Sequence, residues 1–236
     1  MKLKAVLFDL DGTLLPMDLN VFFKQYFKLL SIKLMPYGYD PQKLVDTIWK
    51  GVVAVEKNDG KRLNEEVFFD TYESVFGVES REHRWLLDDF YLNEFQSLIE
   101  YCSYVPEAKV AVKEIKKIGL RMVVATKPIF PEEAIFSRMR WAGVEEDDFE
   151  FVTSYKNSKY CKPSEDYYKE ILSKLQLSAE ECLMVGNDVS EDMVAEKVGM
   201  KVFLLKECLI NTENRDISCY NSGNFKDLLN YIDTLI

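Results

Sequence analysis

AVLFDLDGTL, residues 5–14, is the segment of this chain that says most about its fold. Its short apolar run is typical of a buried strand, and side chains two residues apart on a strand point to the same side. Asp9 and Asp11 can therefore be aimed at one point where the strand ends, and Gly12 permits a sharp turn there. Because two carboxylates at one point repel each other unless a cation or a shared proton relieves them, the stretch suggests a metal, a nucleophile and a proton carrier.

From Val105 onward, helical and strand-like segments alternate along the chain. Strands that alternate with helices of this length predict an α/β fold, with a parallel sheet covered by helices on both faces. The expected helices are Glu107–Ile118, Pro131–Trp141, Ser164–Leu175, Glu191–Val198 and Phe225–Leu235, and the expected later strands are Arg121–Ala125, Phe149–Thr153, Cys182–Val185 and Lys201–Leu205.

Between Pro16 and about Cys102, apolar residues recur at three- and four-residue spacing, which predicts helices and hardly any strand. Asp40-Pro41 and Asn64 are expected helix starts, and Trp85–Tyr101 is expected to form one long helix. The chain is therefore divided into a catalytic core, residues 1–15 and 104–236, and an all-helical domain, residues 16–103, inserted after the first strand.

Polar residues follow each of the expected strands, and in a parallel sheet ligands gather beyond the carboxyl ends of the strands. A hydroxyl, an ammonium and further carboxylates thus fall on the same edge as the first two aspartates. These residues are Thr126 and Lys127, then Lys162, then Asn187 and Asp188, followed by Glu191 and Asp192.

Composition limits the classes of function. Forty acidic and thirty basic residues give a net charge of −10, which disfavours a broad nucleic-acid-binding surface. Five cysteines without C-x-x-C spacing predict reduced thiols, with no zinc cluster. The first apolar run is cut short by Asp9, too early for a signal peptide, and no stretch is long enough to span a bilayer. We expect a cytoplasmic protein that binds neither nucleic acid nor membrane.

The strand-end residues, in their order, resemble the four motifs of the haloacid dehalogenase superfamily of phosphohydrolases. These motifs are D-x-D-G-T, a Thr or Ser after the second core strand, Lys-Pro, and G-[DN]-[DS]-x-x-[ED]-[DM], and together they span nearly the whole chain. The resemblance implies a Rossmann-like core sheet, and it implies that residues 16–103 form the type 1 helical cap of that family.

The resemblance also assigns roles to residues. Asp9 would be the nucleophile that forms an aspartyl-phosphate, and Asp11 the general acid and base. Thr126 and the backbone N–H of Lys127 would hold phosphate oxygens, while Lys162 would bind both the nucleophile and the phosphate.

The same resemblance implies a Mg²⁺ cofactor. Asp9, Asp188 and the backbone carbonyl of Asp11 would hold the metal, with Asn187 and Asp192 supporting these ligands from behind. Mg²⁺ prefers one or two carboxylates together with water and phosphate oxygens, which suits this set. Asn187 stands where the family often has Asp, so a metal arrangement with two carboxylates in this motif is not expected.

The expected function is Mg²⁺-dependent hydrolysis of the phosphate monoester of a small metabolite, by a monomer or weak homodimer. A phosphomutase uses the same motifs, and a binding or regulatory module that has lost catalysis is the alternative from another class. Dehalogenation is disfavoured, because Asp11 supplies an acid that an alkyl halide does not need.

Two features of the sequence leave alternatives open. Lys127 stands where family members often have Asn, so its side chain could lie near the phosphate or point towards the cap hinge. The turn 58–62 carries Lys61 and Arg62, which could face the active site or could equally be solvated.

Overall fold

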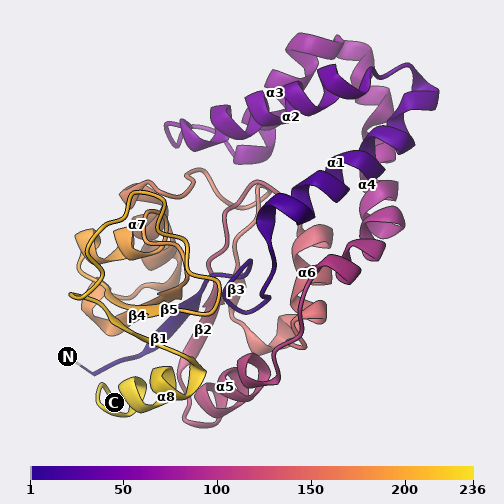
Figure 1. Cartoon of the computed structure of the whole chain (residues 1–236). Helices are drawn as coiled ribbons and strands as arrows, with labels where there is room; N and C mark the ends of the chain where they lie inside the picture. Colours follow the sequence, from indigo (N-terminus) through magenta and orange to yellow (C-terminus); the bar gives the residue numbers. More distant parts are fainter. Residues whose placement is uncertain (1) are drawn as a thin grey trace.

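A computed structural model describes residues 2–236, and its centre is a six-stranded parallel sheet in the order β3-β2-β1-β4-β5-β6 (Figure 1). The predicted α/β class and parallel sheet are therefore confirmed. The strands are β1 (Ala5–Phe8), β2 (Arg121–Val124), β3 (Phe151–Val152), β4 (Cys182–Gly186), β5 (Lys201–Leu205) and β6 (Asn221–Gly223).

Strand β1 lies in the middle of the sheet with all four residues buried. Phe8, its last residue, lies opposite Val124 of β2 and Val185 of β4. The segments that leave β1, β2 and β4 therefore start at the same level of the sheet. This register brings the polar residues of three distant segments to one edge.

Within residues 2–236, eight α-helices surround the sheet or extend from it. They are α1 (Leu19–Leu34), α2 (Pro41–Glu56), α3 (Asn64–Phe76), α4 (Arg84–Leu92), α5 (Pro106–Lys117), α6 (Glu132–Trp141), α7 (Glu165–Leu175) and α8 (Phe225–Asp233).

Alternate residues of β1 enter two separate apolar cores, one on each face of the sheet. Val6 and Phe8 pack with buried residues of α5, α6 and α8, whereas Ala5 and Leu7 pack with α7. The sheet is thus covered by helices on both faces, as the continuous apolar character of its strands predicts.

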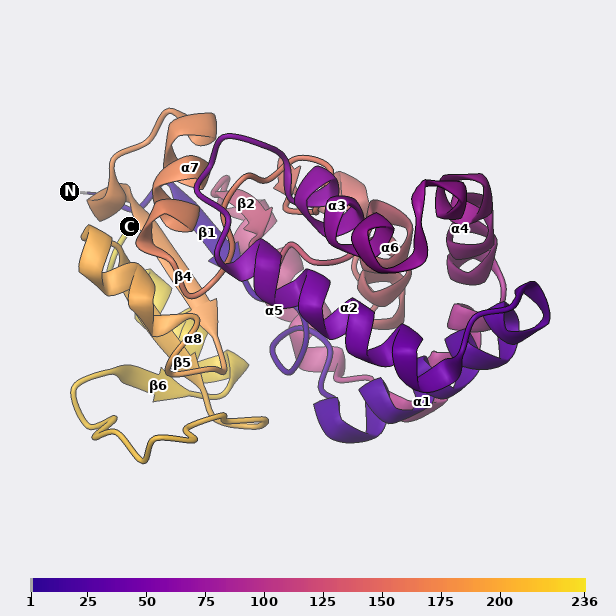
Figure 2. The ribbon, with the colours of Figure 1, turned by 90° about the horizontal axis from the view of Figure 1, so that it is seen from above.

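Helices α1 to α4 form a helical region between β1 and α5 (Figures 1 and 2). Helix α1 leads away from the sheet, and α2 and α3 return above its carboxyl edge (Figure 1). The start of α3 is tied to the core, because the Asn64 N–H donates to the Ser158 carbonyl at 2.9 Å and its side-chain amide donates to the Tyr160 carbonyl at 3.0 Å. None of the helices within residues 2–236 has the length and apolar character needed to cross a membrane.

Two local expectations were wrong, and one strand was missed. Trp85–Tyr101 is not one helix: α4 ends at Leu92, and a 3-10 helix covers Glu94–Tyr101. The Asn93 side chain between them donates to the Asp89 carbonyl at 2.9 Å, a local bond that competes with the helical backbone.

The expected helix over 191–198 is a shorter 3-10 helix, Met193–Val198. Strand β6 was not predicted, because its sequence Asn-Ser-Gly lacks strand character and only pairing with β5 makes it a strand.

Candidate active site

A cleft of about 210 Å³ lies between residues at the carboxyl edge of the sheet and residues of α1 and α2. Its polar wall consists of residues that follow β1, β2 and β4, together with one glutamate of α2. These residues are Asp9, Asp11, Thr126, Lys127, Asn187, Asp188, Glu191, Asp192 and Glu56. Seven of the eight site residues expected from the sequence therefore line one cleft, and the eighth, Lys162, contacts Asp9 from behind it.

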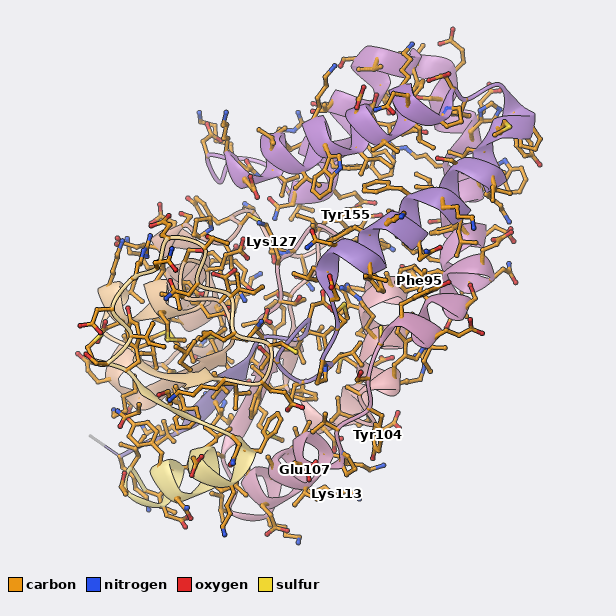
Figure 3. All side chains as sticks on the ribbon, viewed as in Figure 1. Phe95, Tyr104, Glu107, Lys113, Lys127 and Tyr155 are labelled. Atoms are coloured by element: carbon orange, nitrogen blue, oxygen red, sulfur yellow. The ribbon has the colours of Figure 1, made fainter. Side chains whose placement is uncertain are left out.

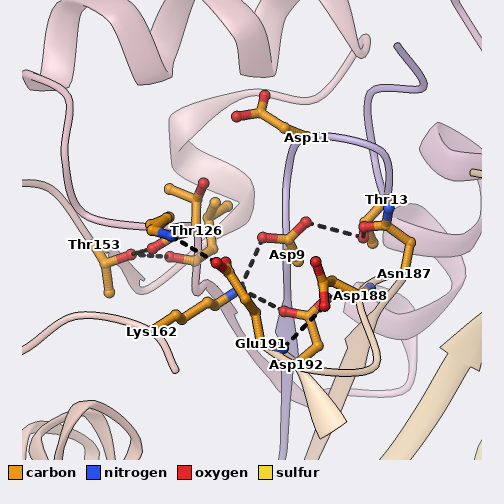
Figure 4. A network of polar contacts seen from close by, with 12 residues as sticks. Asp9, Asp11, Thr13, Thr126, Thr153, Lys162, Asn187, Asp188, Glu191 and Asp192 are labelled. Atoms are coloured by element: carbon orange, nitrogen blue, oxygen red, sulfur yellow. Dashed lines mark hydrogen bonds and ion pairs between the residues drawn. The ribbon is translucent and has the colours of Figure 1, made fainter. Parts of the chain in front are cut away.

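Asp9 is the first residue after β1, and both of its carboxylate oxygens are held (Figure 4). Lys162 donates from Nζ to Oδ1 at 2.8 Å, and the Thr13 hydroxyl donates to Oδ2 at 3.1 Å. The Asp9 side chain is nearly buried, so these contacts fix a carboxylate at the floor of the cleft in one orientation.

Lys162 is buried between two carboxylates, since its Nζ also donates to Asp192 Oδ1 at 2.6 Å. Burial alone would lower the pKa of Lys162, but Asp192 and Asp9 outweigh this effect and raise it well above its usual range. Burial raises the pKa of Asp192 to about 7, against the opposing effect of Lys162. Asp192 Oδ2 also accepts the Asp188 N–H at 3.0 Å, so the carboxylate joins Lys162 to the loop after β4.

The turn after β1 requires glycine at position 12. Gly12 has a φ of +85°, and a Cβ there would lie 2.4 Å from the side-chain amide nitrogen of Asn187. Asn187 Oδ1 accepts from the Thr13 hydroxyl at 2.9 Å, and its Nδ2 donates to the Cys208 carbonyl at 2.6 Å. Asn187 thus packs the loop after β4 against the Asp9 turn.

Asp188 is fixed by its own loop. Its Oδ1 accepts from the N–H and the hydroxyl of Ser190, both at 2.7 Å, and from the Glu191 N–H at 3.0 Å. These bonds hold the carboxylate at the cleft wall that it shares with Asp9.

Asp11 pairs with an arginine that the sequence analysis missed. Arg138 of α6 is 1% exposed, and its Nη1 donates to Asp11 Oδ2, whereas Figure 4 shows the Asp11 carboxylate turned away from Asp9 and Lys162. Burial raises the pKa of Asp11, and the Arg138 guanidinium opposes that shift. Asp11 Oδ1 and Arg138 Nη2 are buried without a hydrogen-bond partner among the described residues. The sequence signal that could have identified Arg138 is its position on the apolar face of α6, where it is buried beside Ala134 and Met139.

Thr126 and Lys127 follow β2, and the fold fixes both. The Thr126 carbonyl accepts from the hydroxyls of Thr153 and Tyr167, each at 2.8 Å. The Lys127 ammonium lies 2.6 Å from Glu191 Oε1 and 2.7 Å from Glu56 Oε1, so it points to helix α2 (Figure 3). Burial alone would lower the pKa of Lys127, but the two glutamates raise it.

The turn at residues 58–62 lies away from the cleft. Lys61 pairs with Asp59 at 2.5 Å, Arg62 pairs with Asp70, and all four side chains are substantially exposed. Between the two interpretations of this turn, the structure favours the solvated one.

The residues that line the cleft suit Mg²⁺ better than they suit a metal ion whose ligands are all side chains. Within residues 2–236, no group of three or more His, Cys, Asp or Glu side chains is arranged to hold a metal ion. Mg²⁺ takes one or two carboxylates and completes its shell with water and phosphate oxygens. Asp9 and Asp188, which line the same cleft, are a donor set of that kind.

Comparison with known proteins identifies the family. The model of the haloacid dehalogenase-like hydrolases matches residues 3–199, which include every residue of the candidate site. A ribulose-1,5-bisphosphate 5-phosphatase of Halopiger xanaduensis is 23% identical over 205 residues, which cover 85% of this chain and 83% of that protein.

Two solved structures share the fold over almost the full chain. CbbY of Rhodobacter sphaeroides, solved in complex with phosphate, has a TM-score of 0.60 and 16% identity, over 99% of this chain and 100% of its own. The HAD-hydrolase YfnB of Bacillus subtilis, solved with magnesium and showing interdomain movement, has a TM-score of 0.56 and 14% identity, over 99% of this chain and 100% of its own.

Proposed function

We propose, because the chain belongs to the haloacid dehalogenase-like hydrolase family, that it is a phosphatase that hydrolyses small-molecule phosphate monoesters with Mg²⁺ as cofactor, through a phosphorylated Asp9. The observation that carries this proposal is the contact of 2.8 Å between Lys162 Nζ and Asp9 Oδ1 in the cleft. This contact places the buried ammonium of Lys162 beside Asp9, the carboxylate that directly follows strand β1 and lines the cleft. The similar phosphatase and the phosphate-bound neighbour support the choice of substrate.

The first chemical step is attack by Asp9 on phosphorus, with breakage of the bond between phosphorus and the alcohol oxygen. An anionic carboxylate and an anionic phosphate repel each other, so phosphoryl transfer depends on positioning and on neutralising the phosphate oxygens. Lys162 would supply one positive charge, and the Thr126 hydroxyl and the Lys127 backbone N–H would orient the oxygens. Mg²⁺, held by Asp9, Asp188 and the Asp11 carbonyl, would supply the remaining positive charge.

Asp11 would move the proton in both steps. It would protonate the leaving alcohol oxygen and then take a proton from the water that cleaves the acyl phosphate, help that is typically worth about 10²–10⁴ in rate. Burial raises its pKa, which favours the protonated form needed first. Because its carboxylate is paired with Arg138, we propose that Asp11 rotates towards the cleft when substrate binds.

We further propose that residues 16–103 act as the cap of this site. Helices α1 and α2 supply the wall of the cleft opposite the sheet edge, through Leu19, Phe23, Trp49, Val52 and Glu56. Such a wall excludes water from a reactive acyl phosphate and can move to admit substrate.

The test is phosphate release from acetyl phosphate and p-nitrophenyl phosphate with Mg²⁺. Asp9→Asn should abolish release and also the trapping of label from radioactive acetyl phosphate, because an amide does not attack phosphorus. Asp147→Asn, the same change at an exposed position, is the control and should behave as wild type. Activity near wild type in Asp9→Asn would contradict the mechanism.

A further inference from the structure

We propose that the alcohol part of the substrate is small and apolar or aromatic, and that the substrate carries a single phosphate. This inference rests on the proposed phosphatase function and narrows its substrate class. It comes from the character of the cleft wall that faces the phosphate site.

Helix α2 presents an apolar face to the cleft. Trp49, Val52 and Glu56 all line it, and their spacing of three and four residues places them on one side of the helix. Only the last of the three carries a charge, and its carboxylate is engaged by Lys127 at 2.7 Å. The wall therefore offers the substrate an indole ring and an isopropyl group.

The rest of this wall is aromatic and aliphatic as well. Phe23 of α1 lies with its ring centre 5.5 Å from that of Trp49, and 6.3 Å from that of Phe130 in a stacked arrangement. Phe130 and Ile129 belong to the core segment after β2, so apolar side chains from both parts of the molecule meet here. Ligand pockets of this kind bind chiefly by apolar contact, with a few polar groups fixing orientation.

The space available limits the size of the group. The cleft holds about 210 Å³, somewhat more than the roughly 150 Å³ of a cavity that binds benzene. The aromatic cluster behind Phe23 and Trp49 leaves only about 30 Å³, so an organic group cannot extend into it. A phosphate and a body of about the size of a propyl or benzyl group fit the cleft.

Charge argues against a second phosphate or a carboxylate on the substrate. Among the described residues that line the cleft, Lys127 is the one cation, and Glu191 and Glu56 already flank it at 2.6 and 2.7 Å. The Lys162 ammonium likewise already donates to two carboxylates, those of Asp9 and Asp192. A second anionic group on the substrate would therefore meet acidic side chains. The substrate of this chain should differ in this respect from the bisphosphate named for the similar Halopiger protein.

Hydroxyl groups on the alcohol would also lose their water against this wall. A buried polar group without a partner is disfavoured, and a hydrophobic pocket rejects an analogue with an added hydroxyl by up to about 10². A polyol phosphate should therefore be a poorer substrate than an alkyl phosphate with the same number of carbon atoms.

The experiment compares kcat/KM of the Mg²⁺-loaded full chain for matched esters. n-Propyl phosphate and glycerol 1-phosphate have the same carbon skeleton, benzyl phosphate adds a ring, and ribulose 1,5-bisphosphate adds a second phosphate. We expect the propyl and benzyl esters to exceed glycerol phosphate and the bisphosphate by about tenfold or more, the scale of discrimination in hydrophobic pockets.

A pair of tryptophan variants tests the wall itself. Trp49→Ala should lower the ratio of kcat/KM for benzyl phosphate to that for acetyl phosphate by about tenfold. Trp85→Ala, which removes an exposed tryptophan of α4 that does not line the cleft, should leave this ratio unchanged.

The outcomes separate the two proposals. Glycerol phosphate or the bisphosphate turned over as well as or better than the propyl ester would overturn the apolar-substrate inference and leave the phosphatase standing. An unchanged ratio in Trp49→Ala would overturn it as well. Absence of release from every ester, acetyl phosphate and p-nitrophenyl phosphate included, would refute the phosphatase and with it this inference.

Discussion

At the scale of single residues, Asp11 faces a buried arginine instead of the carboxylate two positions before it. Arg138 is held in place, because its Nε donates to the Ala134 carbonyl at 3.1 Å and its guanidinium lies 4.5 Å from the centre of the Phe130 ring. The pair gives Asp11 a defined position outside the phosphate site. Arg138 is therefore a positioning residue for the proposed acid and base.

A double-mutant cycle tests this pair. Arg138→Met and Asp11→Asn should each destabilise the protein, but the double variant should be more stable than the sum of the two effects predicts. The reason is that either single change leaves a buried group without its partner. We expect a coupling free energy of about 1–3 kcal/mol, measured by urea unfolding of the four proteins. Additive free energies would show that the two side chains do not stabilise each other.

At the scale of elements, Lys127 joins helix α2 to the core. Its ammonium lies between Glu56 at the end of α2 and Glu191 in the loop after β4, and the side chains of Lys127 and Glu56 are 24% and 32% exposed. The residue that departs from the family pattern thus connects the proposed cap to the catalytic edge. Asn64 makes a second connection at the start of α3.

Removing the Lys127 contact should loosen the proposed cap. Glu56→Gln keeps the shape of the side chain but removes its charge, and a partly exposed ion pair is worth about 0.5–1 kcal/mol. Amide hydrogen exchange in α2 should accordingly become roughly two- to fivefold faster. Glu165→Gln, at an exposed pair with 3.9 Å between Lys169 and Glu165, is the control. Equal exchange in both variants would mean that the contact does not restrain α2.

At the scale of the whole molecule, an acidic chain with a net charge of −10 concentrates carboxylates at one cleft. Asp9, Asp188, Glu191 and Asp192 all line it, and the Asp192 side chain is fully buried. A bound divalent cation would relieve the mutual repulsion of these carboxylates in the folded state. The unfolded chain does not bring these carboxylates together, so it offers the cation no such site.

Mg²⁺ should therefore stabilise the fold as well as support activity. A ligand at about 100 times its Kd adds roughly 2.7 kcal/mol, and a chain of this size gains about 2–4 °C per kcal/mol, so Tm should rise by about 5–10 °C. NaCl at equal ionic strength should not reproduce the rise, and Asp188→Asn should lose it whereas Asp147→Asn keeps it. Chelation should stop phosphate release. An equal Tm in Mg²⁺ and NaCl would argue against a site at Asp188.

The amino-acid sequence alone predicts the α/β class, the ends of the main strands and the residues that gather there. The reason is that alternation along a strand, helical spacing and glycine turns are local properties, and parallel strands bring their carboxyl ends to one edge. Asp9 and Lys162 could thus be expected together although 153 positions separate them, and the structure places them 2.8 Å apart.

Which charged side chains meet across elements depends on the tertiary structure. Arg138 reaches Asp11 from 127 positions away, and Lys127 pairs with Glu56 at the end of α2, because the folded chain brings these segments together at the carboxyl edge of the sheet. Pairing with β5 likewise makes a strand of Asn221–Gly223. Partner choice between distant side chains depends on three-dimensional proximity, and no local pattern in the sequence encodes it.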